Sequence, residues 1–321
     1  MAAPCRIAVA GAGAFGREHL KGLGRRNDVA VVGVADPSAA AGEAAVRTYG
    51  AEAAFADAVA MLETTRPDGL IVATPGPTHL AVARAALDRS VPVLLEKPVG
   101  MTAAEADALI AAEAASPAFV LPGHILRFSA PYREMAAIVH SGALGPVCGV
   151  SSRKHRDATH AVRYPDVDPV LMTLVHDIDF LLWATGARLE TVLALRNPRD
   201  SFRSVTVVAG RDTSGATWNL SNAWVVPGAC PPDRIEVACE RGTVEMEVGV
   251  AIRVSGETQR TIDVSAATDD DMLDTELAAF LDGIRDGGHP GHVTLADARN
   301  GLALADAVAR SLATGAVETV T

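Results

Sequence analysis

The sequence RIAVAGAGAFGREHLKGLGRRNDVAVVGVAD, residues 6–36, decides the fold. It opens with a short apolar run typical of a buried strand, and the glycine-rich turn Gly11 to Gly16 follows at once. A helical stretch through Leu23 and a second apolar run ending at Asp36 complete the pattern. A GxGxxG turn between a strand and a helix, with an acidic residue about 20 positions later, predicts a dinucleotide-binding βαβ unit.

The turn residues have distinct mechanical roles in this interpretation. Gly11 allows the tight turn, Gly13 lets the backbone approach a pyrophosphate, and Gly16 lets helix and strand pack closely. The helix that starts at Ala14 and Phe15 offers N–H donors and partial positive charge at its N-terminus. These residues are therefore expected to bind the phosphates of the cofactor.

Asp36 is the candidate that selects the cofactor. Its carboxylate would accept hydrogen bonds from the adenosine ribose, which favours NAD over NADP because a 2′-phosphate would meet a negative charge. A structural alternative is a helix N-cap, since Pro37 follows in the N1 position. The two roles can coexist.

Length and composition indicate a soluble two-domain enzyme. The 321 residues are 49% apolar, yet they contain no apolar stretch long enough to span a bilayer. A net charge of −11 disfavours nucleic acid and anionic membranes as partners. The first strand begins too near Met1 to leave room for a signal peptide, so a cytoplasmic location is expected. Four dispersed cysteines without a CxxC pair argue against a structural zinc site, and no metal is expected.

The order of elements predicts an α/β fold in two domains. Apolar runs alternate with alanine-rich helical segments up to Pro122-Gly123, which is typical of βαβ units and a parallel sheet. We therefore expect a doubly wound Rossmann domain at residues 1–123. Strands joined by short loops then predict an α+β domain with a mostly antiparallel sheet at residues 124–321, closed by two amphipathic helices.

The tripeptide Glu96-Lys97-Pro98 closes another apolar run. The chain has three lysines against twenty-five arginines, so a lysine at the end of a buried strand suggests a role that arginine cannot fill. An ammonium group can donate a proton or hold a substrate hydroxyl, whereas a guanidinium stays protonated. A solvated strand end is the alternative, but ligands bind at the carboxyl ends of strands in open α/β sheets.

A second candidate catalytic group, His176, lies on a helix predicted over residues 168–185. Asp168 followed by proline is a good helix start, and the helix carries Met172, His176, Asp179 and Trp183 along one face. An imidazole that titrates near neutral pH can take a hydroxyl proton while a hydride leaves for nicotinamide. The alternative is a histidine that is hydrogen-bonded in the core.

Weaker candidates for substrate contacts are Arg127, His155, Tyr164, Met172 and Thr173. Arg127 could line the pocket or form a surface ion pair. His155 belongs to a basic cluster, residues 153–156, that could face an anionic or polyhydroxylated substrate or could be a solvated face. Tyr164, in a Pro-bounded loop, could close over the substrate or pack against the protein.

The chain resembles the Gfo/Idh/MocA oxidoreductases, whose types are glucose-fructose oxidoreductase and inositol dehydrogenase. The resemblance covers nearly the whole length and rests on Gly11–Gly16, Asp36, Ala73-Thr74-Pro75 with His79, Glu96-Lys97-Pro98 and His176-Asp177-Ile178-Asp179. It implies NAD- or NADP-dependent oxidation of a sugar, a cyclitol or a related hydroxyl, or the reverse reaction. Thr74, Pro75, His79, Glu96 and Lys97 are then expected at the cofactor.

In this family the lysine of the tripeptide contacts the reacting hydroxyl, and the histidine of the later helix is the general acid/base. The resemblance also implies an open-faced sheet in the second domain, used for assembly of a homodimer or homotetramer.

One residue departs from the family pattern. The family often has an aspartate four residues before the catalytic histidine, and Met172 stands there in this chain. A thioether cannot orient an imidazole, so Thr173 or Asp179, three residues away on either side, would have to reach the ring. The function predicted is an NAD-dependent dehydrogenase acting on a CH–OH group. The alternative is a non-catalytic sensor that binds a dinucleotide and a sugar on the same scaffold.

Overall fold

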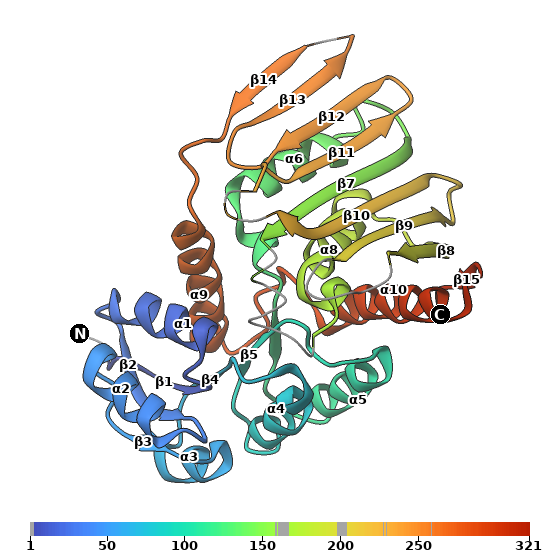
Figure 1. The fold of residues 1–321 in the computed structure, drawn as a ribbon. Coiled ribbons are helices and arrows are strands. Elements are labelled where there is room, and N and C mark those ends of the chain that lie inside the picture. Colours follow the sequence, from blue (N-terminus) through green and yellow to red (C-terminus); the bar gives the residue numbers. More distant parts are fainter. Residues whose placement is uncertain are drawn as a thin grey trace. The chain divides into compact units, whose positions relative to one another are not determined.

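The computed structural model describes residues 3–157, 159, 167–197, 204–226, 228, 230–257 and 259–321 (Figure 1). Contacts divide the chain into two compact units, Met1–Phe128 with Asp269–Arg299, and Ser129–Thr268 with Asn300–Thr321. The division expected after residue 123 differs from these units in two respects. The first unit extends five residues further, to Phe128. It also includes residues 269–299, from the last part of the chain.

The first unit contains a six-stranded sheet in the order β3-β2-β1-β4-β5-β6, and each neighbouring pair is parallel. This is the doubly wound order expected of a Rossmann domain, which confirms the fold class. The strands are β1 (Cys5–Ala10), β2 (Val29–Ala35), β3 (Ala54–Phe55), β4 (Gly69–Val72), β5 (Val93–Glu96) and β6 (Val120–Gly123). The helices are α1 (Ala14–Gly24), α2 (Ala39–Tyr49), α3 (Ala58–Thr65), α4 (His79–Leu87), α5 (Ala103–Ala114) and α9 (Asp269–Asp286), with short 3₁₀ turns η1 (Gly76–Thr78) and η2 (Ile125–Phe128).

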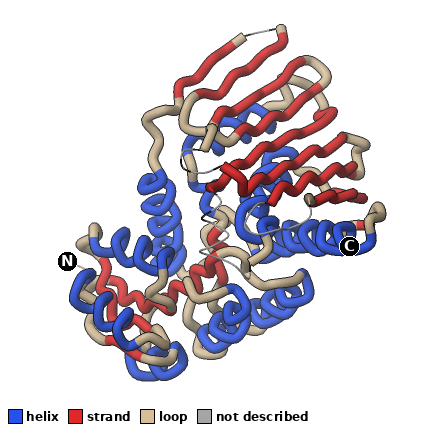
Figure 2. Tube along the Cα trace, in the orientation of Figure 1, coloured by secondary structure: helices blue, strands red, loops and turns tan. Residues whose placement is uncertain are grey.

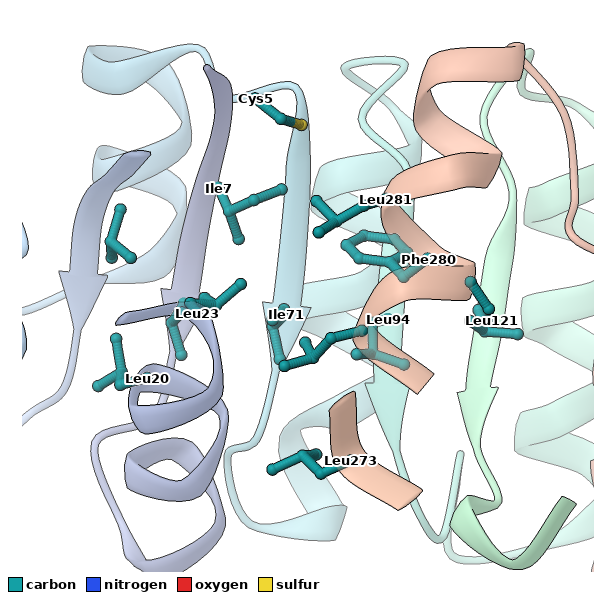
Figure 3. Packing of buried hydrophobic residues seen from close by; sticks show 14 of the residues in the cluster. Cys5, Ile7, Leu20, Leu23, Ile71, Leu94, Leu121, Leu273, Phe280 and Leu281 are labelled. Atoms are coloured by element: carbon teal, nitrogen blue, oxygen red, sulfur yellow. The ribbon is translucent and has the colours of Figure 1, made fainter. Parts of the chain in front are cut away.

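Helix α9 completes the core of this unit although it lies far along the chain. Figure 3 shows Leu273, Phe280 and Leu281 of α9 beside buried residues of the strands. The Phe280 ring meets the Phe119 ring edge-on, with centroids 6.0 Å apart. Full burial of side chains of this size contributes about 1.5–3 kcal/mol each, so α9 is part of the first unit's stability.

The start of α2 corrects one expectation about Asp36. The helix begins at Ala39, and its N-cap is Ser38, whose Oγ accepts the Ala41 N–H at 3.4 Å. Asp36 therefore lies two residues before the cap and does not fill the N-cap role that Pro37 had suggested.

The second unit is built on a nine-stranded sheet in the order β14-β13-β12-β11-β7-β10-β9-β8-β15 (Figure 2). Its neighbours are antiparallel except for β7 and β10, which confirms the mostly antiparallel sheet. The strands are β7 (Val147–Asp157), β8 (Leu189–Arg196), β9 (Ser204–Asp212), β10 (Thr217–Val226), β11 (Arg234–Cys239), β12 (Gly242–Glu247), β13 (Ala251–Gly256), β14 (Arg260–Asp263) and β15 (Glu318–Thr319). The helices are α6 (Ala130–His140), the π-helical η3 (Val170–Leu174), α8 (Val175–Thr185) and α10 (Leu295–Thr314), which begins in the first unit.

One face of this sheet is covered and the other is exposed. Residues alternate between buried and exposed along β9. The helices of the unit pack on the sheet through contacts of η3 with β10 and of α8 with β7. On the opposite face Leu195, Val205 and Val207 are exposed large hydrophobic residues, and Leu195 pairs with Val207 across β8 and β9.

Among the described residues, no helix is both long and apolar enough to cross a bilayer. The four cysteine thiols are unpaired in the structure.

The turn between β9 and β10 is organised by a buried carboxylate. Asp212 Oδ1 accepts hydrogen bonds from the Ser214 and Ala216 N–H groups at 2.9 and 3.0 Å, and Oδ2 accepts from Trp218 Nε1 at 3.1 Å. Burial would raise the pKa of Asp212, but the donors of Ser214, Trp218 and Ala216 lower it overall. The ionised carboxylate therefore stabilises the fold at neutral pH.

Asp212→Asn is expected to lower the free energy of unfolding by about 1–3 kcal/mol at neutral pH, because its amide N–H₂ would face donors. The folded-state pKa of Asp212 is depressed, so this stabilisation is present above the ordinary value of 3.8 and is lost as the pH falls below it. Urea unfolding of the wild type and of Asp212→Asn measures the difference between their free energies of unfolding. This difference should be smaller at acidic pH than at neutral pH. Asp263→Asn, at an exposed carboxylate, is the control with a smaller effect.

Candidate active site

The glycine turn is shaped by close backbone contacts. Gly11 has a φ of +98°, and a Cβ on it would lie 2.4 Å from the Ala73 carbonyl oxygen. A Cβ on Gly16 would lie 1.9 Å from the Gly11 carbonyl oxygen, so both positions require glycine. Gly13 differs, because its Cβ would meet nothing within 4 Å. Open space therefore faces the backbone at Gly13, where the fingerprint places a pyrophosphate.

The N-terminus of α1 opens onto the same turn. Gly13 is the N-cap, and the first N–H bonded within the helix is that of Arg17, which donates to the Gly13 carbonyl at 3.0 Å. The N–H groups of Ala14, Phe15 and Gly16 precede that bond and have no intrahelical acceptor, as in any first turn. A row of such donors, beside the space at Gly13, fits the phosphates of a dinucleotide.

Asp36 ties this turn to the end of β2. Its Oδ2 accepts the Ala12 N–H at 2.8 Å, and its Oδ1 accepts the Ser38 N–H at 2.8 Å. Each carboxylate oxygen accepts more than one hydrogen bond, so Asp36 keeps capacity for a ribose hydroxyl. The carboxylate therefore lies at the turn, as expected for a ribose-binding acid.

Thr74 and Pro75 lie in the loop after β4, and His79 is the first residue of α4. Thr74 is partly exposed and Pro75 is exposed, whereas His79 is buried. His79 Nδ1 lies 2.8 Å from the Pro98 carbonyl oxygen, and Nε2 lies 2.7 Å from that of Thr74. The ring thus joins the loops that follow β4 and β5. Both ring nitrogens contact the main chain, and a contact between His79 and the cofactor stays a prediction.

Lys97 follows the last residue of β5 and is partly exposed. Its Nζ lies 5.6 Å from the centroid of the Phe15 ring, so the ammonium group is beside the first turn of α1. Glu96 points the other way. It is 7% exposed, Oε1 lies 2.8 Å from His19 Nε2, and Oε2 accepts the Lys97 N–H at 3.2 Å. Glu96 therefore supports the strand end from inside, and a contact with the cofactor stays a prediction.

Two buried residues near Glu96 were missed from the sequence, His19 on α1 and Glu276 on α9. A signal existed for Glu276, because it falls among Leu273, Leu277 and Phe280 on the apolar stripe of α9. A glutamate on a buried stripe is unusual and indicates a specific role.

Arg127 forms an ion pair, as one of its two expected roles requires, but from a buried position. Its side chain is only 4% exposed, so it is not a surface residue. Nη1 lies 3.4 Å from both Asp297 Oδ2 and the His292 carbonyl oxygen, all within the first unit. Arg127 thus pairs from the interior with a partly exposed carboxylate, close to the end of β6. A contact with substrate stays a prediction.

The segment that leads to His176 differs from the regular helix expected. Residues Val170–Leu174 form a π-helical turn, and the regular helix α8 begins only at Val175. Met172 and His176 are both partly exposed, whereas Thr173 is 4% exposed. The extra residue in a π-turn changes the spacing of side chains, and such turns are frequent at functional sites.

Thr173 serves the core of the second unit. Its hydroxyl accepts hydrogen bonds from Trp224 Nε1 at 2.9 Å and from Asn222 Nδ2 at 3.4 Å, and Asn222 also donates to the Pro169 carbonyl at 3.0 Å. The π-turn is thereby fixed onto β10. The Thr173 side chain is buried against this strand. A contact between Thr173 and substrate stays a prediction.

The basic cluster on β7 is largely a buried charge network. Lys154 Nζ lies 2.7 Å from Asp177 Oδ1 and 3.2 Å from Asp233 Oδ2, and Arg156 also binds Asp233. Burial would lower the pKa of Lys154, but the neighbouring Asp177 and Asp233 carboxylates raise it overall. Because Asp177 follows His176 directly, this network holds the start of α8 against β7.

His155 is half-buried between these charges. Burial and then the cations Arg153 and Arg156 lower its pKa, against the opposing effect of Asp233. It is therefore a neutral imidazole at neutral pH and remains a candidate for a substrate contact. Tyr164 lies outside the described residues.

Known proteins with the same two-domain pattern are similar to this chain along its length. The model described as "Oxidoreductase family, NAD-binding Rossmann fold" matches residues 5–124, and that of the GFO/IDH/MocA C-terminal domain matches residues 132–245. Inositol 2-dehydrogenase from Ralstonia nicotianae is 28% identical, over 98% of this chain and 96% of its own length.

Two solved structures share the fold. Myo-inositol 2-dehydrogenase from Lactobacillus plantarum superposes with a TM-score of 0.86 at 20% identity, over 99% of this chain and 100% of its own. Scyllo-inositol dehydrogenase from Lactobacillus casei, solved with NAD(H) and scyllo-inositol, gives a TM-score of 0.86 at 19% identity, over 99% of each chain. With both family models matched in order, the chain belongs to the Gfo/Idh/MocA family of NAD-binding oxidoreductases.

Proposed function

We propose that this protein catalyses the NAD-dependent oxidation of a CH–OH group on a cyclitol or a related small polyol, or the reverse reduction. The observation that carries the proposal is the position of Lys97. Its ammonium group lies at the carboxyl end of β5 and over the ring of Phe15, on the helix that follows the glycine turn. A cofactor bound along that turn would have a proton donor beside its reactive end.

The residues divide the work as follows. Bound NAD accepts the hydride from the substrate carbon. Lys97 holds the reacting hydroxyl, and His176 takes the hydroxyl proton during oxidation or returns it during reduction. Asp36 binds the adenosine ribose, and the first turn of α1 binds the pyrophosphate. Met172 and His155 face the rest of the substrate.

The substrate class is supported by the relatives. Inositol 2-dehydrogenase from Ralstonia nicotianae matches nearly the whole chain. The structurally similar enzyme from Lactobacillus casei was solved with scyllo-inositol. Both names point to a ring carrying several hydroxyl groups, and lysine and histidine are suitable partners for such hydroxyls.

We also propose a homodimer or homotetramer assembled through the open face of the nine-stranded sheet, with a cytoplasmic location. The exposed side chains of Leu195, Val205 and Val207 lie on that face, and contiguous apolar patches of this kind mark association surfaces.

Exchanging the turn glycines should separate cofactor binding from folding. Gly13→Ala has room for its Cβ, so the melting temperature should stay near that of the wild type while NAD affinity falls about tenfold or more, since the methyl group occupies the pyrophosphate position. Gly16→Ala should instead prevent folding, because of the contact with the Gly11 carbonyl. Calorimetric titration with NAD and thermal unfolding measure the two effects. Unchanged NAD affinity in folded Gly13→Ala protein would contradict the assignment.

Lys97→Ala and His176→Ala should each lower turnover by about two orders of magnitude, as removal of a positioned acid or base usually does. NAD affinity should change little, because neither residue is assigned to the adenosine or the pyrophosphate. A screen of inositols, sugars and sugar acids, read by NADH absorbance, identifies the substrate first. Lys21→Ala and His140→Ala, at other positions of the two units, are the matched controls. Near wild-type turnover in both site variants would refute the proposal.

Met172 should set the substrate preference. A pocket carboxylate favours substrates that present a hydroxyl to it, and an apolar thioether favours a substrate that is deoxygenated or methylated there. Met172→Asp should therefore weaken activity on the native substrate and raise it on a fully hydroxylated inositol, measured as the ratio of kcat/KM values. Strong wild-type turnover of such an inositol, unchanged in Met172→Asp, would exclude this role. Binding of NAD without any turnover in either protein would indicate a sensor.

A further inference from the structure

Three buried acid–base side chains lie together behind the strand end that carries Lys97. His19 comes from α1, Glu96 from β5 and Glu276 from α9, with exposures of 0%, 7% and 0%. One nitrogen or oxygen atom of each lies within 4.8 Å of the others. Among the described residues, both carboxyl oxygens of Glu276 and Nδ1 of His19 are buried without a hydrogen-bond partner. Unsatisfied polar atoms of this kind require a physical explanation.

The cluster cannot hold two carboxylate charges at low cost. Burial acts to raise the pKa of Glu96, but the hydrogen bond and charge of His19, together with Lys97, lower it overall. Burial and then the Glu96 charge raise the pKa of Glu276 well above its ordinary value of 4.5. Glu96 is therefore the ionised member and Glu276 the protonated one. When two carboxylates share a buried site, one of them keeps its proton.

Other charges near these elements are engaged elsewhere. Lys21 and Arg25, further along α1, form ion pairs with the exposed Asp270 and Asp274 of α9. Arg127, on the η2 turn that packs against α9, contacts Asp297. Protonation of Glu276 is thus the direct way to neutralise it.

A bound divalent cation is the competing explanation, because one histidine and two glutamates form a suitable donor set. The geometry disfavours it. His19 Nε2 and Glu96 Oε1 are 2.8 Å apart, which is hydrogen-bond distance, whereas two ligand atoms on tetrahedral zinc lie about 3.3 Å apart for bonds of 2.0–2.1 Å. A metal-binding histidine also donates its other ring N–H to an acceptor, and His19 Nδ1 has none among the described residues.

The cluster is connected to Lys97 through the main chain. Glu96 Oε2 accepts the Lys97 N–H at 3.2 Å, so the orientation of the Glu96 carboxylate fixes the backbone from which Lys97 extends. On the other side, a Cβ on Gly123 would lie 3.1 Å from the Glu96 Cα, so β6 leaves little room for a shift. A neutral Glu276 can bridge the remaining gap with a hydrogen bond, directly or through one water molecule. An ionised Glu276 would repel Glu96.

We propose that Glu276 is a positioning residue for Lys97: in its neutral, protonated form it closes the cluster with His19 and Glu96 and holds the Glu96–Lys97 segment in place. The inference rests on the role of Lys97 in the proposed function. It assigns to α9, which follows β14 of the second unit in sequence, a part in the chemistry at the end of β5.

Two substitutions at one position separate this role from simple packing. Glu276→Gln preserves the shape of the neutral acid, so kcat should stay near wild type and the melting temperature at neutral pH should be equal or higher. Glu276→Leu removes the polar group, so kcat should fall about tenfold or more while the NAD dissociation constant stays unchanged, since small displacements of a catalytic group are costly. Asp274→Asn, an exposed position on the same helix, is the matched control.

Two further measurements on the intact protein do not depend on turnover. The infrared difference spectrum of wild type minus Glu276→Gln should contain the C=O band of a protonated carboxyl at neutral pH. Modification by an amine-selective reagent, read by peptide mass spectrometry, should change at Lys97 in Glu276→Leu but not in Glu276→Gln, with the exposed Lys21 as internal reference.

Each contrary result has a definite meaning. Wild-type kcat and Lys97 reactivity in Glu276→Leu would overturn the proposal. The proposal would also be overturned if the infrared band of the protonated carboxyl were missing, or if Glu276→Gln and Glu276→Leu lowered kcat equally. One equivalent of tightly bound metal in the purified protein would overturn it too. If the wild type turned over no polyol, or Lys97→Ala kept full turnover, the proposed function would fail instead, and the infrared and labelling results would still decide whether Glu276 positions Lys97.

Discussion

The first unit's chemistry depends on one constraint, the parallel pairing of strands at the carboxyl-terminal edge of the six-stranded sheet. Gly11 N donates to the Ala35 carbonyl at 2.7 Å, and Ala73 N donates to the Ala10 carbonyl at 2.8 Å. These bonds bring the loops after β1, β2 and β4 together. The contact is so close that a side chain on Gly11 would overlap the Ala73 carbonyl. Whatever chemistry the unit performs must therefore use the residues that this edge presents, which include Asp36 and Lys97.

The sequence was a good guide wherever a signal was local. The glycine turn and the order of strands and helices both follow from spacing over a few residues. It was a poor guide to side-chain direction. His79 and Glu96 lie in the motifs where a cofactor contact was expected, yet both turn toward the protein interior. A motif specifies which residue type stands at a strand end, whereas the direction of its side chain depends on partners far away in sequence.

Contacts between residues far apart in the chain could not be predicted from the sequence. Helix α9 is amphipathic in the sequence, but nothing in its periodicity indicates that it returns to the first unit's sheet. Glu276 could be noticed as a glutamate on an apolar stripe, whereas its partners His19 and Glu96 could not be inferred. Similarly, the cations at 153–156 read as a surface cluster until Asp177 and Asp233 are placed beside them.

The two units neutralise buried charge in different ways, and the difference bears on function. In the second unit Lys154 and Arg156 face Asp177 and Asp233, so two cations match two anions. Removing one partner of such a network leaves an uncompensated charge and costs about 3–5 kcal/mol, which makes it a rigid support for the start of α8. The three-residue cluster behind Lys97 has no such balance, and neutrality there depends on where protons reside. Matched ion pairs keep their charges when a charge nearby changes. The position of a proton shared between two carboxylates shifts with the surrounding charge. The group behind Lys97 is therefore the more sensitive to the charge of whatever binds at the strand end.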